Sequence, residues 1–82
     1  MAKHIVVEVM NRDIRYWIYE TFSEAKVGML ERLVSVSHDT MLSLEYIISN
    51  PNCSGYYSID NKSAWLDAFG GDKLYDWQII EV

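Results

Sequence analysis

The sequence predicts an α+β domain, in which an antiparallel sheet of three to four strands with an N-terminal hairpin carries two to three helices on one face. Three observations support this fold class. Two segments near the N-terminus alternate apolar and polar residues, a segment with helical spacing follows, and the last nine residues alternate again. The chain has 82 residues, which is enough for one domain, residues 1–82, with a small core.

The N-terminal alternation predicts an antiparallel hairpin. Residues 4–10 are rich in β-branched side chains and alternate between two faces, which is typical of a strand. Residues 11–13, Asn-Arg-Asp, are turn formers that tolerate left-handed backbone. Residues 14–22 alternate in the same way, so we expect the two strands to pair across this short turn.

A helix is predicted to follow the hairpin and to end near Val34 or Val36. Thr21 and Glu24 fit a capping box, and Ser23 is a competing N-cap. Apolar residues recur at helical spacing and would lie on the hairpin: Ala25, Met29, Leu30, Leu33 and Val36. Gly28 costs a helix about 1 kcal/mol relative to alanine, which suggests that a neighbouring element approaches closely there.

Residues 37–50 allow two interpretations. Asp39 or Thr40 would cap a short helix that ends before Asn50-Pro51, because a residue before proline disfavours helical geometry. The same residues also alternate as a strand, which would form a hairpin from about Leu42 into Tyr56. We favour the helix, since cap and stop signals bracket it.

The remaining chain predicts a short strand at residues 56–59, a helix at 62–69 and a final strand at 74–82. Asp60 or Asn61 would cap the helix, and Gly70-Gly71 would end it. A C-terminal strand is ordered only if it pairs, so we expect it beside the N-terminal hairpin.

Aromatic residues carry much of the functional signal, since the chain has three Trp and six Tyr but two Phe. Tyr and Trp are enriched in protein interfaces. We expect Tyr16, Trp65 and Trp77 in the core, and at least one of four other residues in an interface: Trp17, Tyr19, Tyr56 and Tyr57. One helix layer would leave the second sheet face open, and we expect that face to carry Arg15, Trp17 and Tyr19, with Tyr75 and Trp77 as further candidates. Self-association through this face or an edge strand is an equal alternative to a foreign partner.

The charge is unevenly distributed. Residues 1–32 hold five basic and five acidic side chains, whereas residues 33–82 hold two basic and seven acidic ones, so the net charge of −5 lies entirely in the second part. An acidic face steers association with a basic protein surface, although a net charge of this size also serves solubility. It argues against direct binding to nucleic acid or an anionic membrane.

No residue pattern predicts a reaction or a cofactor. His4, His38 and Cys53 lack the spacing of a metal site, and no base lies beside Cys53 in the sequence. Gly70-Gly71 follows the predicted helix, unlike a phosphate-binding loop. We therefore expect a protein that is not an enzyme and that binds no cofactor or metal. A single cysteine and the absence of a signal peptide favour a reducing, cytoplasmic location.

The layout resembles small phage-encoded inhibitors of host defence, such as anti-CRISPR proteins. The resemblance lies in the hairpin of residues 5–22, the helix that opens at Ser23-Glu24-Ala25-Lys26, and the acidic second part that ends in Trp77-Gln78-Ile79-Ile80-Glu81-Val82. No diagnostic motif is shared, so no functional residue is carried over. The resemblance implies a stoichiometric inhibitor that occupies a partner's surface, often a basic nucleic-acid channel.

The first hypothesis is therefore a non-enzymatic inhibitor or adaptor that binds a basic surface of a partner protein. The predicted partner-binding residues are Asp60, Asp67, Asp72, Asp76, Tyr56, Tyr57, Trp65, Trp17 and Tyr19. Two alternatives remain open: a homo-oligomer that binds a nucleotide or another small molecule, with arginines contacting any phosphate, and a structural subunit that acts through its own assembly.

Overall fold

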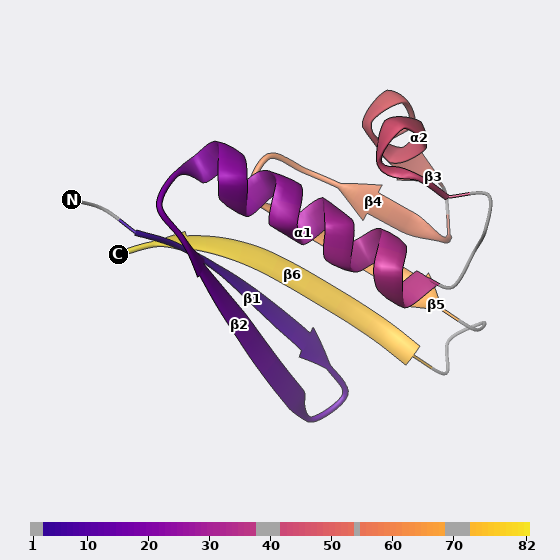
Figure 1. Cartoon of the computed structure of the whole chain (residues 1–82). Coiled ribbons are helices and arrows are strands. Elements are labelled where there is room, and N and C mark those ends of the chain that lie inside the picture. Colours follow the sequence, from indigo (N-terminus) through magenta and orange to yellow (C-terminus); the bar gives the residue numbers. More distant parts are fainter. Residues whose placement is uncertain (1–2, 38–41, 54, 69–72) are drawn as a thin grey trace.

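The structure is a computed structural model that describes residues 3–37, 42–53, 55–68 and 73–82. The described residues form a six-stranded antiparallel sheet in the order β2-β1-β6-β5-β4-β3, with one long helix and one short one (Figure 1). The elements are β1 (His4–Met10), β2 (Asp13–Tyr19), α1 (Phe22–Ser37), α2 (Leu44–Ser49), β3 (Asn52–Cys53), β4 (Tyr57–Ile59), β5 (Ser63–Ala68) and β6 (Lys73–Glu81). The α+β class and the N-terminal hairpin are confirmed, but the sheet has more strands than the three or four predicted.

The helix α1 packs against one face of the sheet, and the core lies between them (Figure 1). The buried apolar residues of α1 are the five with helical spacing in the sequence, and Ser37 at its end is buried as well. They meet side chains from β1, β4, β5 and β6, among which Val6, Tyr57, Leu66 and Trp77 are almost completely buried. Burial of this surface is the main favourable term in folding.

The hairpin forms as predicted, and β6 lies beside it. Met10 pairs with Asp13 across a two-residue loop, whose first residue, Asn11, has a φ of 55°. A two-residue hairpin requires a positive φ at such a position, and asparagine tolerates it. On the other side, β1 pairs with β6 along its whole length, so β1 is an interior strand of the sheet, next to the edge strand β2.

The predicted orientation of the two sheet faces was wrong. Trp17 pairs with Val6, and Tyr75 pairs with Met10, so the aromatic residues expected on the open face lie on the α1 side instead. The open face of β2 carries Ile14, Tyr16 and Ile18. Both faces of this strand are apolar, so alternation alone did not show which one α1 covers.

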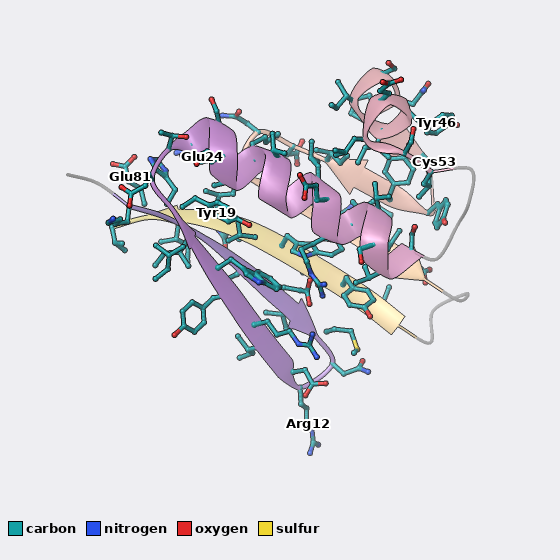
Figure 2. The ribbon with its side chains drawn as sticks, viewed as in Figure 1. Arg12, Tyr19, Glu24, Tyr46, Cys53 and Glu81 are labelled. Carbon is teal, nitrogen blue, oxygen red and sulfur yellow. The ribbon has the colours of Figure 1, made fainter. Side chains whose placement is uncertain are left out.

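The N-terminus of α1 is capped by Thr21. Its Oγ1 accepts a hydrogen bond of 3.1 Å from the Glu24 amide, and its carbonyl accepts one from Ala25. The close approach expected at Gly28 is also present, because a Cβ on this residue would lie 2.2 Å from the Tyr19 hydroxyl. Figure 2 shows Tyr19 reaching from β2 towards α1.

The helix predicted at residues 62–69 is wrong, because residues 63–68 form strand β5. The strand pairs with β4 on one side and with β6 on the other. Ala64 and Leu66 point into the core and are buried, whereas Trp65 points to the open face. Pairing with β4 and β6 satisfies the backbone hydrogen bonds along both edges of β5, and this outweighs the local helix-cap signals at Asp60 and Asn61. The predicted end of the helix, Gly70-Gly71, lies outside the described residues.

The favoured helix in residues 37–50 is confirmed, but it is short. Its N-cap is Ser43, whose side chain accepts a hydrogen bond from the Tyr46 amide. The predicted caps, Asp39 and Thr40, lie outside the described residues. The rival strand from about Leu42 is wrong, because residues 44–49 are helical; a different small hairpin forms, in which Cys53 of β3, from the segment expected to be a turn, pairs with Tyr57 of β4.

A substitution at Gly28 tests the contact between α1 and β2. We expect Gly28→Ala to lower the free energy of unfolding by about 1–2 kcal/mol through overpacking against Tyr19, although alanine is the better helix former. In a Tyr19→Ala background the same change raises stability by up to about 1 kcal/mol. Urea unfolding of the unmodified protein, the two single variants and the double variant measures this double-mutant cycle. An equal effect of Gly28→Ala in both backgrounds contradicts the contact.

Candidate functional site

The candidate site lies on the open face of the sheet, opposite α1. Side chains that alternate away from α1 on β1, β2, β5 and β6 have no helix above them in the described part of the chain. Several are large, apolar and exposed: Ile14, Tyr16, Ile18, Trp65, Leu74 and Ile80. A sheet face this apolar is unusual in a monomer and is typical of a binding surface.

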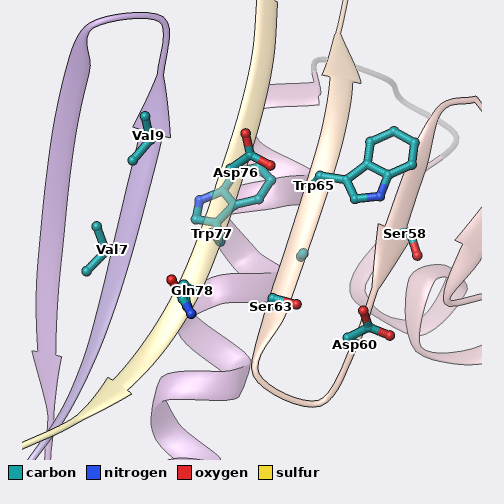
Figure 3. A pocket seen from close by; sticks show the side chains of 10 residues that line it. Val7, Val9, Ser58, Asp60, Ser63, Trp65, Asp76, Trp77 and Gln78 are labelled. Atoms are coloured by element: carbon teal, nitrogen blue, oxygen red, sulfur yellow. The ribbon is translucent and has the colours of Figure 1, made fainter.

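A groove crosses four strands of this face (Figure 3). One row across the sheet contains Val9, Asp76, Trp65 and Ser58, which are successive cross-strand partners. The next row contains Val7, Gln78 and Ser63, and Asp60 lies at the end of β4. We call these eight residues the acidic groove. Its volume is about 280 Å³, at the small end of the range of ligand pockets, and this is enough for a single long side chain.

The electrostatics of the acidic groove favour a cation. Both of its ionisable side chains, Asp60 and Asp76, are exposed carboxylates, and no described basic residue lines it. Asp76 lies directly opposite Trp65 in the ladder between β5 and β6. Carboxylates beside an aromatic ring form a recognition site for lysine or arginine, since the ring face also attracts a cation.

Lys26 fixes the loop that carries Asp60. Its Nζ donates hydrogen bonds to the main-chain carbonyls of Asp60 and Asn61. Partial burial lowers the pKa of Lys26, and the nearby charge of Asp60 acts in the opposite direction. The loop between β4 and β5 is thus tied to α1, which positions Asp60 at the groove.

The structure brings together three of the nine predicted partner-binding residues: Asp60, Trp65 and Asp76. Asp67 also alternates to the open face, opposite Leu74. Trp17 and Tyr19 lie on the α1 side, and Asp72 lies outside the described residues.

The two tyrosines of the set lie apart from the groove. Tyr57 is completely buried, so it belongs to the core rather than to a contact surface. Tyr56 is half-buried and packs edge-on against Tyr57, with ring centroids 5.6 Å apart. Three other aromatic residues were expected in the core. Trp77 is buried there, as predicted, but the prediction was wrong for Tyr16 and Trp65, which are 66% and 37% exposed.

Sequence analysis missed a buried polar cluster between α1 and the sheet. Glu8 is 3% exposed, and its carboxylate accepts hydrogen bonds from Arg32 Nε at 2.9 Å and Arg32 Nη2 at 3.0 Å. The Trp77 indole donates a further bond of 2.8 Å to the same carboxylate. The Arg32 guanidinium also lies 4.9 Å from the centre of the Trp17 ring. The sequence contained one sign of this cluster, because Glu8 is a charged residue on the face of β1 that otherwise packs under α1.

This cluster is structural in character. Its bidentate geometry is a strong form of ion pair, and the hydrogen bond to Glu8 raises the pKa of Arg32, so the guanidinium stays charged. Among the described residues, every buried side-chain polar atom has a hydrogen-bond partner. The cluster therefore holds α1 on β1 and β6 and leaves no buried polar group unsatisfied.

Removal of one partner tests the cluster. We expect Arg32→Met to lower the free energy of unfolding by about 3–5 kcal/mol, because it leaves the Glu8 carboxylate buried without its ion pair. Adding Glu8→Gln, which keeps an acceptor for Trp77, restores more than half of this loss. Arg12→Met at the exposed hairpin turn is the matched control and changes stability little. Chemical denaturation of the unmodified protein and these three variants measures the free energies of unfolding. A small loss of this free energy in Arg32→Met contradicts the structural role.

The buried Tyr57 predicts a pH dependence. Burial raises its pKa above the ordinary value of about 10, and the nearby Tyr46 and Cys53 act in the same direction. The unfolded chain ionises first, so this stabilisation is complete below about pH 10 and is lost as the pH rises through the folded-state pKa. We expect the free energy of unfolding to fall above about pH 10.

Tyr57→Phe flattens this alkaline fall, although it also removes the hydrogen bond of 2.6 Å from the Tyr57 hydroxyl to the Asn50 carbonyl. Tyr16→Phe at an exposed position is the control and leaves the fall unchanged. Denaturation curves measured at several pH values decide the point. An identical alkaline fall in Tyr57→Phe would show that this phenol is not responsible.

Three further findings concern metal binding, membrane-spanning helices and similarity to known proteins. No cluster of His, Cys, Asp or Glu suited to a metal ion occurs within the described residues. No helix in the described ranges is long and apolar enough to cross a membrane. Comparison with known protein families, with curated proteins and with solved structures gives no match for this chain. The functional assignment therefore depends on the geometry of the site.

Proposed function

We propose that this chain is a non-enzymatic protein-binding module that acts as a stoichiometric inhibitor or adaptor and holds a basic surface of its partner on the open face of its sheet. The observation that carries the proposal is the acidic groove. Two exposed carboxylates, Asp60 and Asp76, flank Trp65 in one depression, and the described lining holds no basic residue, while Lys26 of α1 interacts with the charge of Asp60 from outside it.

The groove suits a lysine or arginine side chain of a partner. The carboxylates would pair with the cation, and the Trp65 ring would cover its aliphatic stem and attract its charge. Exposed ion pairs contribute modestly to affinity, but they steer association and fix orientation. The apolar residues around the groove, including Leu74 and Ile80, would supply the buried contact area.

The proposal also includes the kind of partner surface and the cellular location. A basic surface of this kind occurs in nucleic-acid channels, which the layout's resemblance to phage-encoded inhibitors also implies. The single cysteine, Cys53, favours a reducing cytoplasmic location. Direct binding of nucleic acid is disfavoured, because the net charge of −5 repels phosphate.

The proposal is tested with a fluorescently labelled oligo-lysine peptide as the probe. We expect its binding to weaken with added salt, and the double variant Asp60→Asn/Asp76→Asn to lose about three- to tenfold in affinity. Glu31→Gln/Glu45→Gln removes the same charge from exposed positions on α1 and α2 and serves as the matched control. Fluorescence anisotropy measures the affinities.

Trp65→Leu separates the aromatic contribution from charge, and we expect a further loss of affinity at constant net charge. Equal losses in the groove and control double variants would show that the peptide senses only overall charge, and the proposed site would then be wrong. An unchanged affinity in both double variants contradicts the proposal as well.

A further inference from the structure

The strand β2 forms the long open edge of the sheet. It has one neighbour, β1, in the strand order, whereas the opposite edge is the two-residue strand β3. Natural edge strands are usually protected by charges, proline, bulges or short length. β2 has seven residues and no proline, and its open face carries Ile14, Tyr16 and Ile18, which are 69%, 66% and 58% exposed.

The hydrogen-bond pattern shows which backbone groups point to this edge. Lys3 and Val82 exchange both of their main-chain hydrogen bonds, at 2.8 and 2.9 Å. Because such pairs alternate along an antiparallel ladder, the odd-numbered residues of β1 bond to β6, and the even-numbered ones bond to β2. The even-numbered residues of β1 are paired with odd-numbered residues of β2. The N–H and C=O groups of Ile14, Tyr16 and Ile18 therefore point to the open edge.

We propose that β2 pairs with β2 of a second copy of this chain, antiparallel and about a two-fold axis at Tyr16. In this register Tyr16 lies opposite Tyr16, and Ile14 lies opposite Ile18 of the second copy. The three residues with outward N–H and C=O groups then meet their counterparts, which allows up to about six hydrogen bonds between the strands. A two-fold interface requires this self-complementarity.

The side chains of the strand fit the same register. On the open face, isoleucine meets isoleucine and tyrosine meets tyrosine, which are favourable cross-strand pairs. Just beyond the strand ends, Arg12 falls opposite Glu20 of the second copy, which pairs with Lys3 in its own chain, so no like charges meet there. Moving the axis to residue 15 would place Arg15 against Arg15, a like-charge pair that destabilises a sheet.

The occupant inferred here is therefore a second copy rather than a foreign strand. The hairpin extends away from α1, with Arg12 at its tip, so the helix does not obstruct this edge (Figure 2). The acidic groove lies over β1, β6, β5 and β4, and the pairing leaves it accessible in both copies. The inference goes beyond the proposed function and does not depend on it.

Register-specific cross-linking tests the inference in a Cys53→Ser background. Residues of a hydrogen-bonded pair have Cα atoms about 5.5 Å apart, which is within the range of a disulfide. We expect Tyr16→Cys to give a covalent dimer on mild oxidation. Ile14→Cys alone gives none, but a mixture of Ile14→Cys and Ile18→Cys proteins gives one. Non-reducing electrophoresis reads out all three samples.

Light scattering of the unmodified protein supplies the second measurement. We expect a concentration-dependent mass approaching twice 9.6 kDa. Ile18→Lys places a charged side chain opposite Ile14 of the second copy in place of an apolar pair and reduces the dimer at least tenfold, whereas Val27→Lys, at an exposed apolar position of α1, leaves it unchanged. A monomer at all concentrations overturns the inference, and so does cross-linking of Ile14→Cys alone that equals that of Tyr16→Cys.

Discussion

The buried ion pair between Glu8 and Arg32 fastens α1 to the face of the sheet that it covers. Glu8 lies on the interior strand β1, and Arg32 reaches it from α1 with two hydrogen bonds. Trp77 on β6 bonds to the same carboxylate, and Trp17 on β2 lies beside the guanidinium. A buried carboxylate is costly unless it is paired and hydrogen-bonded, so these contacts from α1, β6 and β2 hold the helix on the face that it covers.

This placement explains the character of the opposite face. Once α1 covers the side of the sheet that carries Trp17, Tyr19 and Trp77, the remaining side carries Ile14, Tyr16 and Ile18 at one end and the acidic groove at the other. The first region offers apolar contact beside an open strand edge. The second offers negative charge and an indole. One structural constraint therefore separates a surface suited to a second copy from a surface suited to a basic partner.

The parts predicted correctly from the sequence are those with strong local signals. The hairpin has alternating strands and Asn11 at its turn, and α1 has its Thr21 cap and apolar spacing. The strand β5 was mistaken for a helix because its pairing partners, β4 and β6, are set by tertiary contacts that a local cap signal does not contain. The two faces of β2 were exchanged because both are apolar. Asp60, Trp65 and Asp76 could be chosen by residue type, but their proximity depends on the register of β5 with β6.

The most direct test of the account uses the three tryptophans as probes in one NMR titration. Trp65 lies in the acidic groove, Trp17 lies under Arg32, and the Trp77 indole is bonded to Glu8. On addition of the oligo-lysine peptide, the account predicts that the Trp65 indole signal shifts in a saturable way, while the signal of Trp17 stays in place; Trp77 also lines the groove, so its signal does not decide the test. A shift of Trp17 with no change at Trp65 would contradict the account, because it would place binding on the side of the sheet that α1 covers.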